Sequence, residues 1–258
     1  MKRILARTRK AIAFAATASA ASMTLTVALS PAAHATASSS ECPSVVVIVV
    51  RGSAETAGTG AISSGHVYKS GGFGISVTAA DDVQTGTSST VRKEAVIYPA
   101  TILPTLADPL GYLLSVTEGR EALGEEVEYL NSVCASSTRI VMIGYSQGAQ
   151  VIGDLLDKTT SQQLSAGAKK RIKAVAFFGD PEFNAAESFD SGTYSKTQNG
   201  LFPRAKGNLS AFASIIRSYC SKGDEFCQAA YPNGGTIHAS YSSSTFQTAA
   251  ANFILGKL

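Results

Sequence analysis

Residues 139–156 read RIVMIGYSQGAQVIGDLL and carry a serine between two glycines. Residues 139–143 form a short apolar run rich in β-branched side chains, which is typical of a buried parallel strand. After Gly148 the apolar residues recur at helical spacing. A strand, a tight glycine-flanked turn and a helix in this order raise a serine hydroxyl above the edge of a sheet. The stretch therefore predicts that Ser146 is a nucleophile, the alternative being a small residue in an ordinary tight turn.

The remainder of the chain alternates between segments of strand and of helix character. Five apolar runs predict strands, at residues 45–50, 94–98, 139–143, 172–178 and 214–219. Helical periodicity is also found at residues 118–133 and 242–255, whereas residues 56–90 are rich in Gly, Ser and Thr and predict no particular element. The alternation predicts an α/β fold: a three-layer, α/β-hydrolase-like (flavodoxin-like) domain around a central, mostly parallel five-stranded sheet.

The first 37 residues have the pattern of a secretory signal peptide. Basic residues precede an uncharged, alanine-rich stretch, and small-x-small sites predict cleavage after Ala35 or Ala37. A retained membrane anchor is the less favoured alternative, because of the Ala, Ser and Thr content and the cleavage sites. We therefore expect a single domain at residues 38–258 of a secreted protein that keeps no stable membrane span after cleavage.

Removal of that segment reverses the net charge. The chain has 22 Lys and Arg against 19 Asp and Glu, and the segment holds five of the basic residues and none of the acidic ones, which leaves 17 against 19, or −2. No basic field remains that would indicate nucleic acid or an anionic membrane surface as a partner. Nothing in the sequence requires more than a monomer.

Export makes disulfide bonds the default for the four cysteines, which can pair in three ways. A bridge between Cys220 and Cys227 is easy because only six residues separate them, and the remainder would then join Cys42 to Cys134. After residue 37 the chain has two histidines and no HExxH motif, so neither a metal site nor a cofactor is expected.

A serine nucleophile needs a base, and a third group must orient that base. In α/β-hydrolases the acid and then the histidine follow the serine, an order that selects His238. The other histidine, His66, lies upstream and is more simply a surface or capping residue. Asp224 is the preferred acid, because a disulfide across its loop would hold the carboxylate rigidly near the sheet edge. Asp180, in a Gly-Asp-Pro turn that ends a strand, is the second choice.

Together these motifs resemble the cutinase family. The resemblance is carried by Gly144-Tyr145-Ser146-Gln147-Gly148, by Cys220-x-x-Gly223-Asp224-x-Phe226-Cys227 and by the late His238. The segments Arg51-Gly52-Ser53-x-Glu55 and Tyr98-Pro99-Ala100 also match, and the similarity runs from Cys42 to about Phe253. The family includes acetylxylan esterases and the cutinase-like lipases and phospholipases of actinobacteria.

The resemblance implies a serine esterase in which Ser146 is the nucleophile, His238 is general base and then acid, and Asp224 orients the histidine. It also implies an oxyanion hole made by the backbone N–H groups of Gln147 and Ser53, with the Ser53 hydroxyl as a further donor. The implied disulfides are Cys42–Cys134 and Cys220–Cys227. Arg51 and Glu55 have no assigned role, and an ion pair that shapes their loop is the simplest interpretation.

The expected substrate is a carboxylic ester, either a cutin-like polyester or a short- or medium-chain acyl ester. Acetylated xylan and lipids or phospholipids are the alternatives on this scaffold, and a catalytically silent surface-binding protein would show a broken triad. An exposed apolar rim would favour polyesters or lipids, and a small polar pocket would favour acetylated xylan. Apolar residues could line an acyl groove or belong to the core: Ile102, Leu103, Leu106, Leu110, Leu113 and Leu114. Phe202 and Phe212 are weaker pocket candidates.

Overall fold

The computed structural model describes residues 41–102, 110–230 and 235–258. The predicted signal peptide with its cleavage sites, and the groove candidates Leu103 and Leu106, lie outside these ranges. Within them, no helix is long and apolar enough to cross a lipid bilayer.

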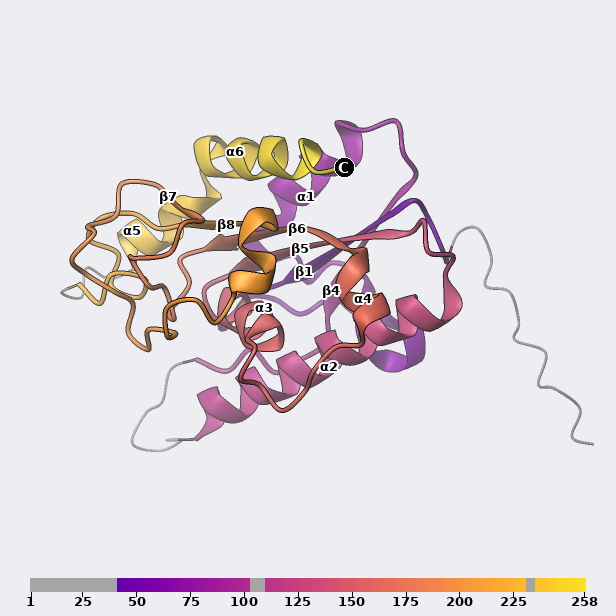
Figure 1. Ribbon diagram of the computed structural model, residues 1–258, viewed down its shortest axis with the longest axis horizontal. Coiled ribbons are helices and arrows are strands. Elements are labelled where there is room, and N and C mark those ends of the chain that lie inside the picture. The colour runs from indigo at the N-terminus through magenta and orange to yellow at the C-terminus, as the bar shows by residue number, and fades with distance from the viewer. Residues whose placement is uncertain (1–40, 103–109, 231–234) are drawn as a thin grey trace, which may run out of the picture. The chain divides into compact units, whose positions relative to one another are not determined.

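The five predicted strands form the parallel centre of the sheet (Figure 1). They lie in the order β4 (Val91–Val96), β1 (Val45–Val50), β5 (Arg139–Tyr145), β6 (Ile172–Phe178) and β8 (Ile216–Tyr219). The predicted α/β fold with a mostly parallel sheet is therefore confirmed. Only the strand ends differ, since β4 lies three residues earlier than the predicted start at residue 94 and β8 begins later than residue 214.

Across the described residues the sheet has eight strands rather than the predicted five. The hairpin of β2 (Thr59–Ile62) and β3 (Val67–Ser70) adds antiparallel strands beside β4, and the two-residue β7 (Asp190–Ser191) pairs with β8. Strand β2 is largely exposed, so its sequence carries no apolar run that would have predicted it. The hairpin turn, η1 (Ser63–Gly65), reverses the chain through three residues of positive φ.

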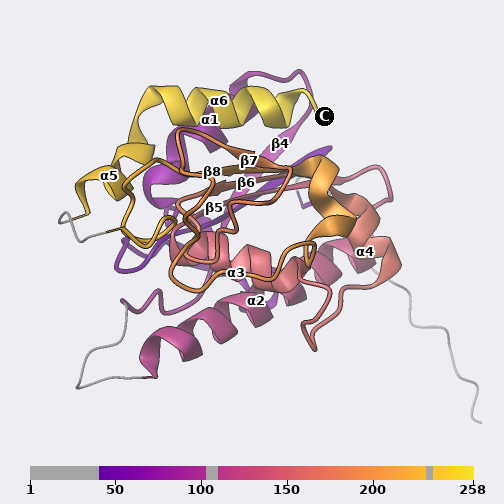
Figure 2. The same cartoon turned by 60° about the vertical axis from the view of Figure 1, so that its left-hand side comes forward.

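Helices cover both faces of the sheet (Figures 1 and 2). On one face lie α2 (Gly111–Val133), α3 (Gln147–Leu156) and α4 (Ala166–Arg171), and on the other α1 (Val77–Thr85) and α6 (Ser244–Leu255). The remaining short elements are η2 (Gly74–Ser76), η3 (Ser210–Ile215), α5 (Thr236–Ala239) and η4 (Ser240–Ser242). This is the predicted three-layer arrangement.

Strand β1 divides the core into two halves. Val46, Ile48 and Val50 pack with the side chains of α2 and α3, whereas Val45, Val47 and Val49 pack with those of α1 and α6. Successive strand residues point to opposite faces, so an unbroken β-branched run is the pattern of a strand buried on both sides. All six side chains are fully buried.

Two helices differ in detail from their predicted form. Helix α2 begins at Gly111 rather than residue 118, so the apolar residues Tyr112, Leu113, Leu114 and Val116 belong to this helix. Helix α6 begins at Ser244, and its buried face consists of Gln247, Ala250, Ala251 and Ile254.

Both predicted disulfides are present. Cys42–Cys134 joins the segment just before β1 to the end of α2, and Cys220–Cys227 closes the loop that follows β8. The first bridge closes a long loop, with a sequence separation of 92, and the second spans a separation of 7. In the chain-entropy account, the longer loop contributes the larger share of stability.

We expect the double variant C42S/C134S to lose about 4–5 kcal/mol of unfolding free energy, because its cross-link restricts a large part of the unfolded chain. The matched variant C220S/C227S should lose only about 2 kcal/mol by the same account. Urea unfolding of both variants and of the parent protein measures the difference. Equal losses, or a larger loss for C220S/C227S, would contradict this expectation.

Candidate active site

Ser146 lies on a strained turn between β5 and α3. Its φ of 53° and ψ of −121° are rarely adopted by residues with a side chain. The Ser146 N–H donates to the carbonyl of Phe178 at 2.8 Å, which ties the turn to the end of β6. The Ser146 carbonyl accepts from the N–H groups of Ala149 and Gln150, which begins the helix. This is the geometry in which a serine hydroxyl stands above the carboxyl ends of parallel strands.

The flanking glycines make this turn possible. A Cβ atom on Gly148 would clash with the carbonyl oxygen of Val50 in β1, and one on Gly144 would lie 2.6 Å from the carbonyl oxygen of Gly148. Helix α3 therefore approaches β1 and β5 more closely than any side chain at these positions would permit.

His238 and Asp224, called the dyad from here on, meet behind this turn. His238 Nδ1 lies 2.9 Å from Asp224 Oδ2 and 3.2 Å from Oδ1. Asp224 is fully buried in the disulfide-closed loop, and His238, on α5, is 5% exposed. The N–H groups of Phe226 and Cys227 donate to Asp224 Oδ1 at 2.7 and 3.2 Å.

Asp224 is held in its charged form. Burial raises the pKa of its carboxyl, but the hydrogen bond and positive charge of His238, the Phe226 N–H and the Tyr241 hydroxyl outweigh burial and leave the pKa below its usual range. An ionised carboxylate on Nδ1 fixes the tautomer of the imidazole, so that the proton sits on Nδ1 and Nε2 is the accepting nitrogen.

Ser146 and His238 line the same pocket of about 270 Å³, together with Ser53, Ile102, Tyr112, Tyr145 and Phe226. The His238 ring contacts the rings of Phe226 and Tyr145, with centroid distances of 4.3 and 4.8 Å. His238 Nε2 is buried and has no hydrogen-bond partner among the described residues. The pocket thus brings together a hydroxyl, an imidazole with a free accepting nitrogen and an apolar wall.

The predicted oxyanion-hole residues are both near Ser146: Gln147 follows it in the chain, and Ser53 lines the same pocket. Gln147 is the first residue of α3, where a backbone N–H has no acceptor within the helix. Its buried side chain is fixed by a bond from Nε2 to the Thr101 carbonyl (2.9 Å) and one from the Ser115 hydroxyl to Oε1 (3.2 Å). Ser53 lies in the loop after β1 and lines the pocket. Backbone donors at a helix start and in a neighbouring loop are the elements of an oxyanion hole.

The loop that carries Ser53 is not held by the predicted ion pair. No ion pair joins Arg51 to Glu55 among the described residues; instead the Arg51 guanidinium donates to the carbonyls of Glu55 (3.0 Å) and Tyr98 (2.6 Å). The Glu55 carboxylate accepts from the N–H groups of Gly52 (2.6 Å) and Ile75 (2.8 Å). Both charged groups therefore shape the loop, but they do so by binding backbone, and backbone partners cannot be read from sequence spacing.

The second-choice acid, Asp180, lies elsewhere. Its fully buried carboxylate pairs with Arg204 at 3.1 Å and accepts the Glu182 N–H at 2.9 Å, so Arg204 rather than a histidine is its partner. His66 is also separate from the pocket, since its Nε2 pairs with Glu125 at 3.0 Å. Asp180 is therefore corrected from a candidate acid to a structural residue.

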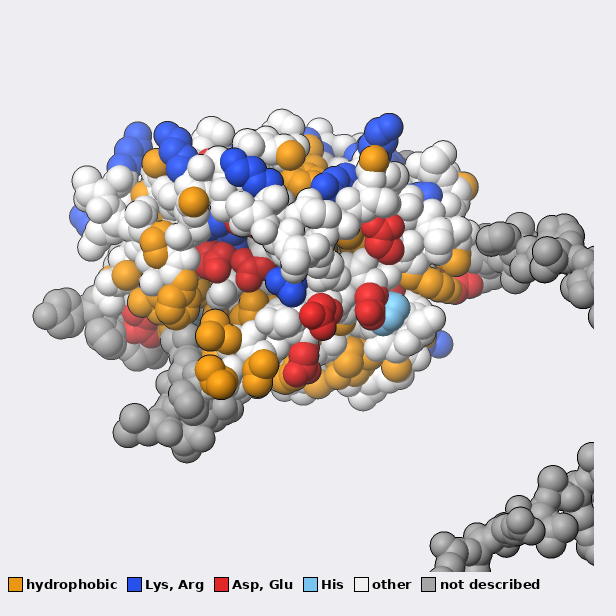
Figure 3. Space-filling model, turned by 60° about the horizontal axis from the view of Figure 1, so that its bottom comes forward, with side chains coloured by type: hydrophobic (Ala, Val, Ile, Leu, Met, Phe, Trp, Pro, Cys, Tyr) orange, Lys and Arg blue, Asp and Glu red, His pale blue; other side chains and the backbone are white. Residues whose placement is uncertain are grey.

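The predicted groove residues divide between surface and core. Ile102 lines the pocket, and Leu110, Leu113 and Leu114 are exposed by 54–61% at the start of α2. Phe202 is 45% exposed and its ring lies 6.3 Å from that of Tyr112, whereas Phe212 is buried in the core and is not a pocket residue. Hydrophobic side chains gather on the face that carries the start of α2 (Figure 3). The described residues therefore form an apolar rim beside the pocket.

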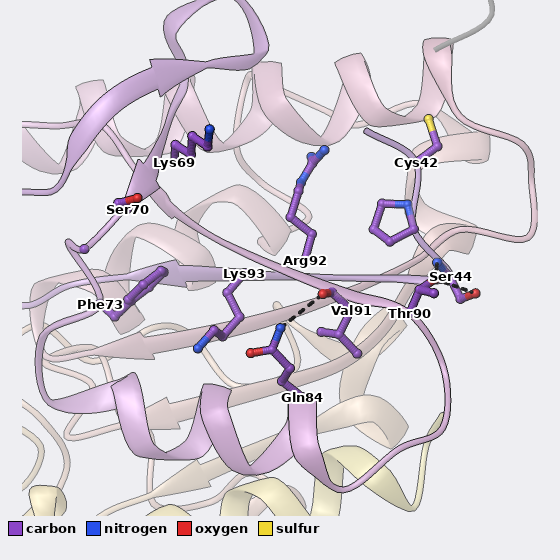
Figure 4. A pocket seen from close by; sticks show the side chains of 12 residues that line it. Cys42, Ser44, Lys69, Ser70, Phe73, Gln84, Thr90, Val91, Arg92 and Lys93 are labelled. Carbon is purple, nitrogen blue, oxygen red and sulfur yellow. Dashed lines mark hydrogen bonds between the residues drawn. The ribbon is translucent and has the colours of Figure 1, made fainter. Parts of the chain in front are cut away.

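A larger groove of about 810 Å³ lies along the outer edge of β4 (Figure 4). It opens because β3 pairs with β4 only at Ala95 and Val96. Two of its charged side chains form ion pairs, Lys93 with Asp81 and Arg92 with Glu94, and Gln84 donates to the Val91 carbonyl at 3.2 Å. Lysine and arginine along a free edge are the usual protection against pairing with another strand. This groove contains none of the predicted catalytic or oxyanion-hole residues, although the disulfide-bonded Cys42 lies at its lining.

Comparison with known proteins finds a matching family and related sequences. The sequence profile of the family described as Cutinase matches residues 41–258. The chain is 32% identical over 196 residues to Acetylxylan esterase 2 of Talaromyces purpureogenus, which covers 72% of this chain and 81% of that one. It is 30% identical over 219 residues to a Cutinase of Kineococcus radiotolerans, covering 83% of this chain and 62% of the relative.

Two solved structures have a fold similar to that of this chain. The catalytic core domain of acetyl xylan esterase from Trichoderma reesei superposes with a TM-score of 0.69 at 28% identity, covering 84% of this chain and all of that one. A cutinase-like protein from Cryptococcus sp. has a TM-score of 0.65 at 22% identity, with 86% and 98% covered, which indicates a shared fold.

The close packing at the glycine-flanked turn of Ser146 leads to a prediction about stability. We expect Gly148→Ala to lower the unfolding free energy by about 1–3 kcal/mol, because the added methyl group forces α3 away from β1. Gly167→Ala is the control, since Gly167 lies in α4 and its added methyl group would meet only the Asn131 side chain, at 3.0 Å. That control should be neutral or slightly stabilising. Denaturant unfolding measures both, and a Gly148→Ala protein as stable as the parent would show that the close approach is not required.

Proposed function

Because the chain belongs to the cutinase family of carboxylic ester hydrolases, we propose that it cleaves its substrate through an acyl-enzyme on Ser146. The observation that carries the proposal is the shared pocket of Ser146 and His238, with the other ring nitrogen of His238 bound to the buried Asp224. A hydroxyl on a strained turn, a correctly oriented imidazole and a carboxylate have together the composition of a serine hydrolase triad.

In this mechanism His238 Nε2 removes the proton of the Ser146 hydroxyl as its oxygen attacks the ester carbonyl carbon. The negative charge of Asp224 stabilises the imidazolium that forms. The tetrahedral oxyanion accepts hydrogen bonds from the N–H groups of Gln147 and Ser53, and a single donor of this kind is worth about 2.7–4 kcal/mol in the transition state.

Collapse of that intermediate breaks the bond to the alcohol oxygen, and His238 returns the proton to the leaving alcohol. Water then attacks the acyl-enzyme, with His238 again as the base, and releases the acid and free Ser146. No step draws on a group other than these side chains, the backbone donors and water.

The apolar rim supports an ester with an apolar acyl part, such as a polyester or a lipid. Leu110, Leu113 and Leu114 are more than half exposed beside a pocket that itself contains Ile102 and three aromatic rings. Contact of such side chains with an insoluble or aliphatic substrate removes apolar surface from water on both partners.

Deacetylation is the second candidate. It is supported by the similarity to relatives named acetylxylan esterases and by the pocket volume of about 270 Å³, which suits a small acyl group. Extracellular action is proposed with either substrate, because residues 1–37 have signal-peptide character and the two disulfides are typical of exported proteins. A monomer is sufficient for the proposed site, which lies within one chain.

The nucleophile is tested with p-nitrophenyl esters of increasing acyl length, from acetate to palmitate. Ser146→Ala should lower turnover at least about a thousandfold, because it removes the attacking oxygen. Ser132→Ala is the control, since the Ser132 hydroxyl bonds only the Tyr129 carbonyl on the exposed face of α2. A maximum at acetate would favour deacetylation and a maximum at longer chains would favour polyesters or lipids. Turnover that survives in Ser146→Ala would refute the proposed mechanism.

The pH dependence of the proposed activity follows from the pairing of His238 with Asp224. Activity should fall as the pH is lowered from about 8 to about 5, because a protonated imidazole cannot take the proton of Ser146. Asp224 stays charged over this range because its pKa lies below the usual value, so one ionisation should describe the acidic limb of kcat/KM. An initial rate that is constant across this range would contradict the role of His238.

A further inference from the structure

We propose that Tyr241 is a positioning residue of the active site. Its hydroxyl holds the Asp224 carboxylate against His238 and weakens the effect of the Asp224 charge on the imidazole. The proposal rests on the function proposed for the dyad and extends it to a residue outside the triad. Tyr241 is fully buried and does not line the pocket, so it acts through Asp224 and does not contact the substrate.

The hydrogen bonds of Tyr241 have one favoured direction. Its hydroxyl oxygen lies 2.8 Å from the Ser221 N–H and 2.8 Å from Asp224 Oδ2. The hydroxyl also lies 3.3 Å from Cys227 Sγ, but a disulfide sulfur has no proton to donate and is a much weaker acceptor than an ionised carboxylate. The Ser221 N–H can only donate and an ionised carboxylate can only accept, so the Tyr241 hydroxyl accepts from Ser221 and donates to Asp224. The result is a directed chain from Ser221 through Tyr241 and Asp224 to His238, in which each bond polarises the next.

His238 and Tyr241 belong to the same short helical segment, formed by α5 and η4. Their spacing of three residues puts both side chains on the same side of that segment, and both contact Asp224 Oδ2. The two rings meet edge to face, with centroids 6.0 Å apart and planes at 90°. One turn of backbone therefore supplies both the imidazole and a second donor to the same carboxylate oxygen.

The position of Tyr241 is fixed from its other side as well. Its ring packs against Phe246 at 4.9 Å and Phe178 at 6.2 Å. Its carbonyl accepts from Gln247 Nε2 at 2.6 Å, and Gln247 Oε1 accepts from the Ala79 N–H at 2.9 Å, which connects the segment to α1. Tyr241 thus has little freedom to move away from Asp224.

Several titratable side chains surround the dyad. Asp224 and Tyr241 face His238, and Tyr145 from β5 contacts its ring. Glu55 in the loop after β1 acts electrostatically on Tyr145, and Glu225 follows Asp224 in the loop after β8. Burial raises the pKa of the Tyr145 and Tyr241 phenols, so both are neutral donors at ordinary pH. Tyr241 is therefore an uncharged donor to Asp224, which among the described residues is the only carboxylate that bonds His238. Its hydrogen bond stabilises the negative charge of that carboxylate.

Removing the Tyr241 hydroxyl makes the Asp224 charge more available to His238. The imidazolium is then more strongly stabilised, and His238 should keep its proton to a higher pH. We expect Tyr241→Phe to move the acidic limb of kcat/KM to higher pH. We also expect kcat at high pH to fall about tenfold, because Asp224 loses a donor that fixed its orientation, with KM little changed.

The experiment compares Tyr241→Phe with Tyr219→Phe. Tyr219 is a buried tyrosine of the same aromatic cluster, stacked on Phe178 at 5.4 Å, and among the described residues no side-chain hydrogen bond joins it to Asp224. Loss of its hydroxyl should leave the acidic limb in place. A Tyr241→Phe enzyme with the acidic limb of the parent protein would overturn the proposal, and so would an equal displacement in Tyr219→Phe.

A double-variant cycle tests whether Tyr241 acts through Asp224. In an Asp224→Asn background, Tyr241→Phe should cause almost no further loss of kcat, because its partner charge is already absent. The same tenfold loss in both backgrounds would mean a packing role and would overturn the proposal.

The titration of His238, followed by NMR in the parent protein and in Tyr241→Phe, provides a readout that needs no turnover. A displaced titration supports the coupling, and an unchanged one overturns it. If Ser146→Ala were still active, the function proposed above would be wrong, yet this titration would still decide the role of Tyr241. The two failures are therefore distinguishable.

Discussion

The close approach of helix α3 to strands β1 and β5 is the constraint on which the site depends. Without side chains at positions 144 and 148, the start of α3 comes within reach of the Val50 carbonyl, and the backbone between them must take the positive φ of Ser146. That single turn sets the height of the serine hydroxyl above the sheet and points the first free N–H of α3 at the same place. Strain at this point is balanced by the two packed halves of the core.

The remaining functional groups reach this point from loops that follow other parallel strands. Ser53 comes after β1 and Asp224 after β8, so the carboxyl-terminal edge of the sheet collects them. The loops are held by backbone contacts of charged side chains in one case and by a disulfide in the other. A rigid sheet edge with individually anchored loops explains how residues so distant in sequence line one pocket.

Much of this could be predicted from the sequence because the relevant signals are local. The residue pattern of β1 reports burial on both faces, the glycines around Ser146 report a close approach, and the order of serine, acid and histidine leaves few candidates. The roles of Asp180 and Asp224 could not be separated by such reasoning, since both aspartates follow a strand of the sheet, Asp180 after β6 and Asp224 in the loop after β8. Only Arg204, distant in sequence, makes Asp180 structural. The hairpin of β2 and β3 was missed because the exposed β2 carries no apolar run. The contacts of Arg51, Glu55 and Tyr241 were missed because their partners are backbone groups or residues distant in sequence.

The contact from Gln247 to the Tyr241 carbonyl makes the proposed site depend on a helix that lies outside the pocket. Helix α6 gives no side chain to the pocket, yet its docking secures the segment that carries His238. Local undocking of α6 would therefore loosen His238 while the turn at Ser146, bonded to the end of β6, stays intact. A serine hydroxyl without its base is a poor nucleophile, so the docking of α6 is a condition for the proposed activity.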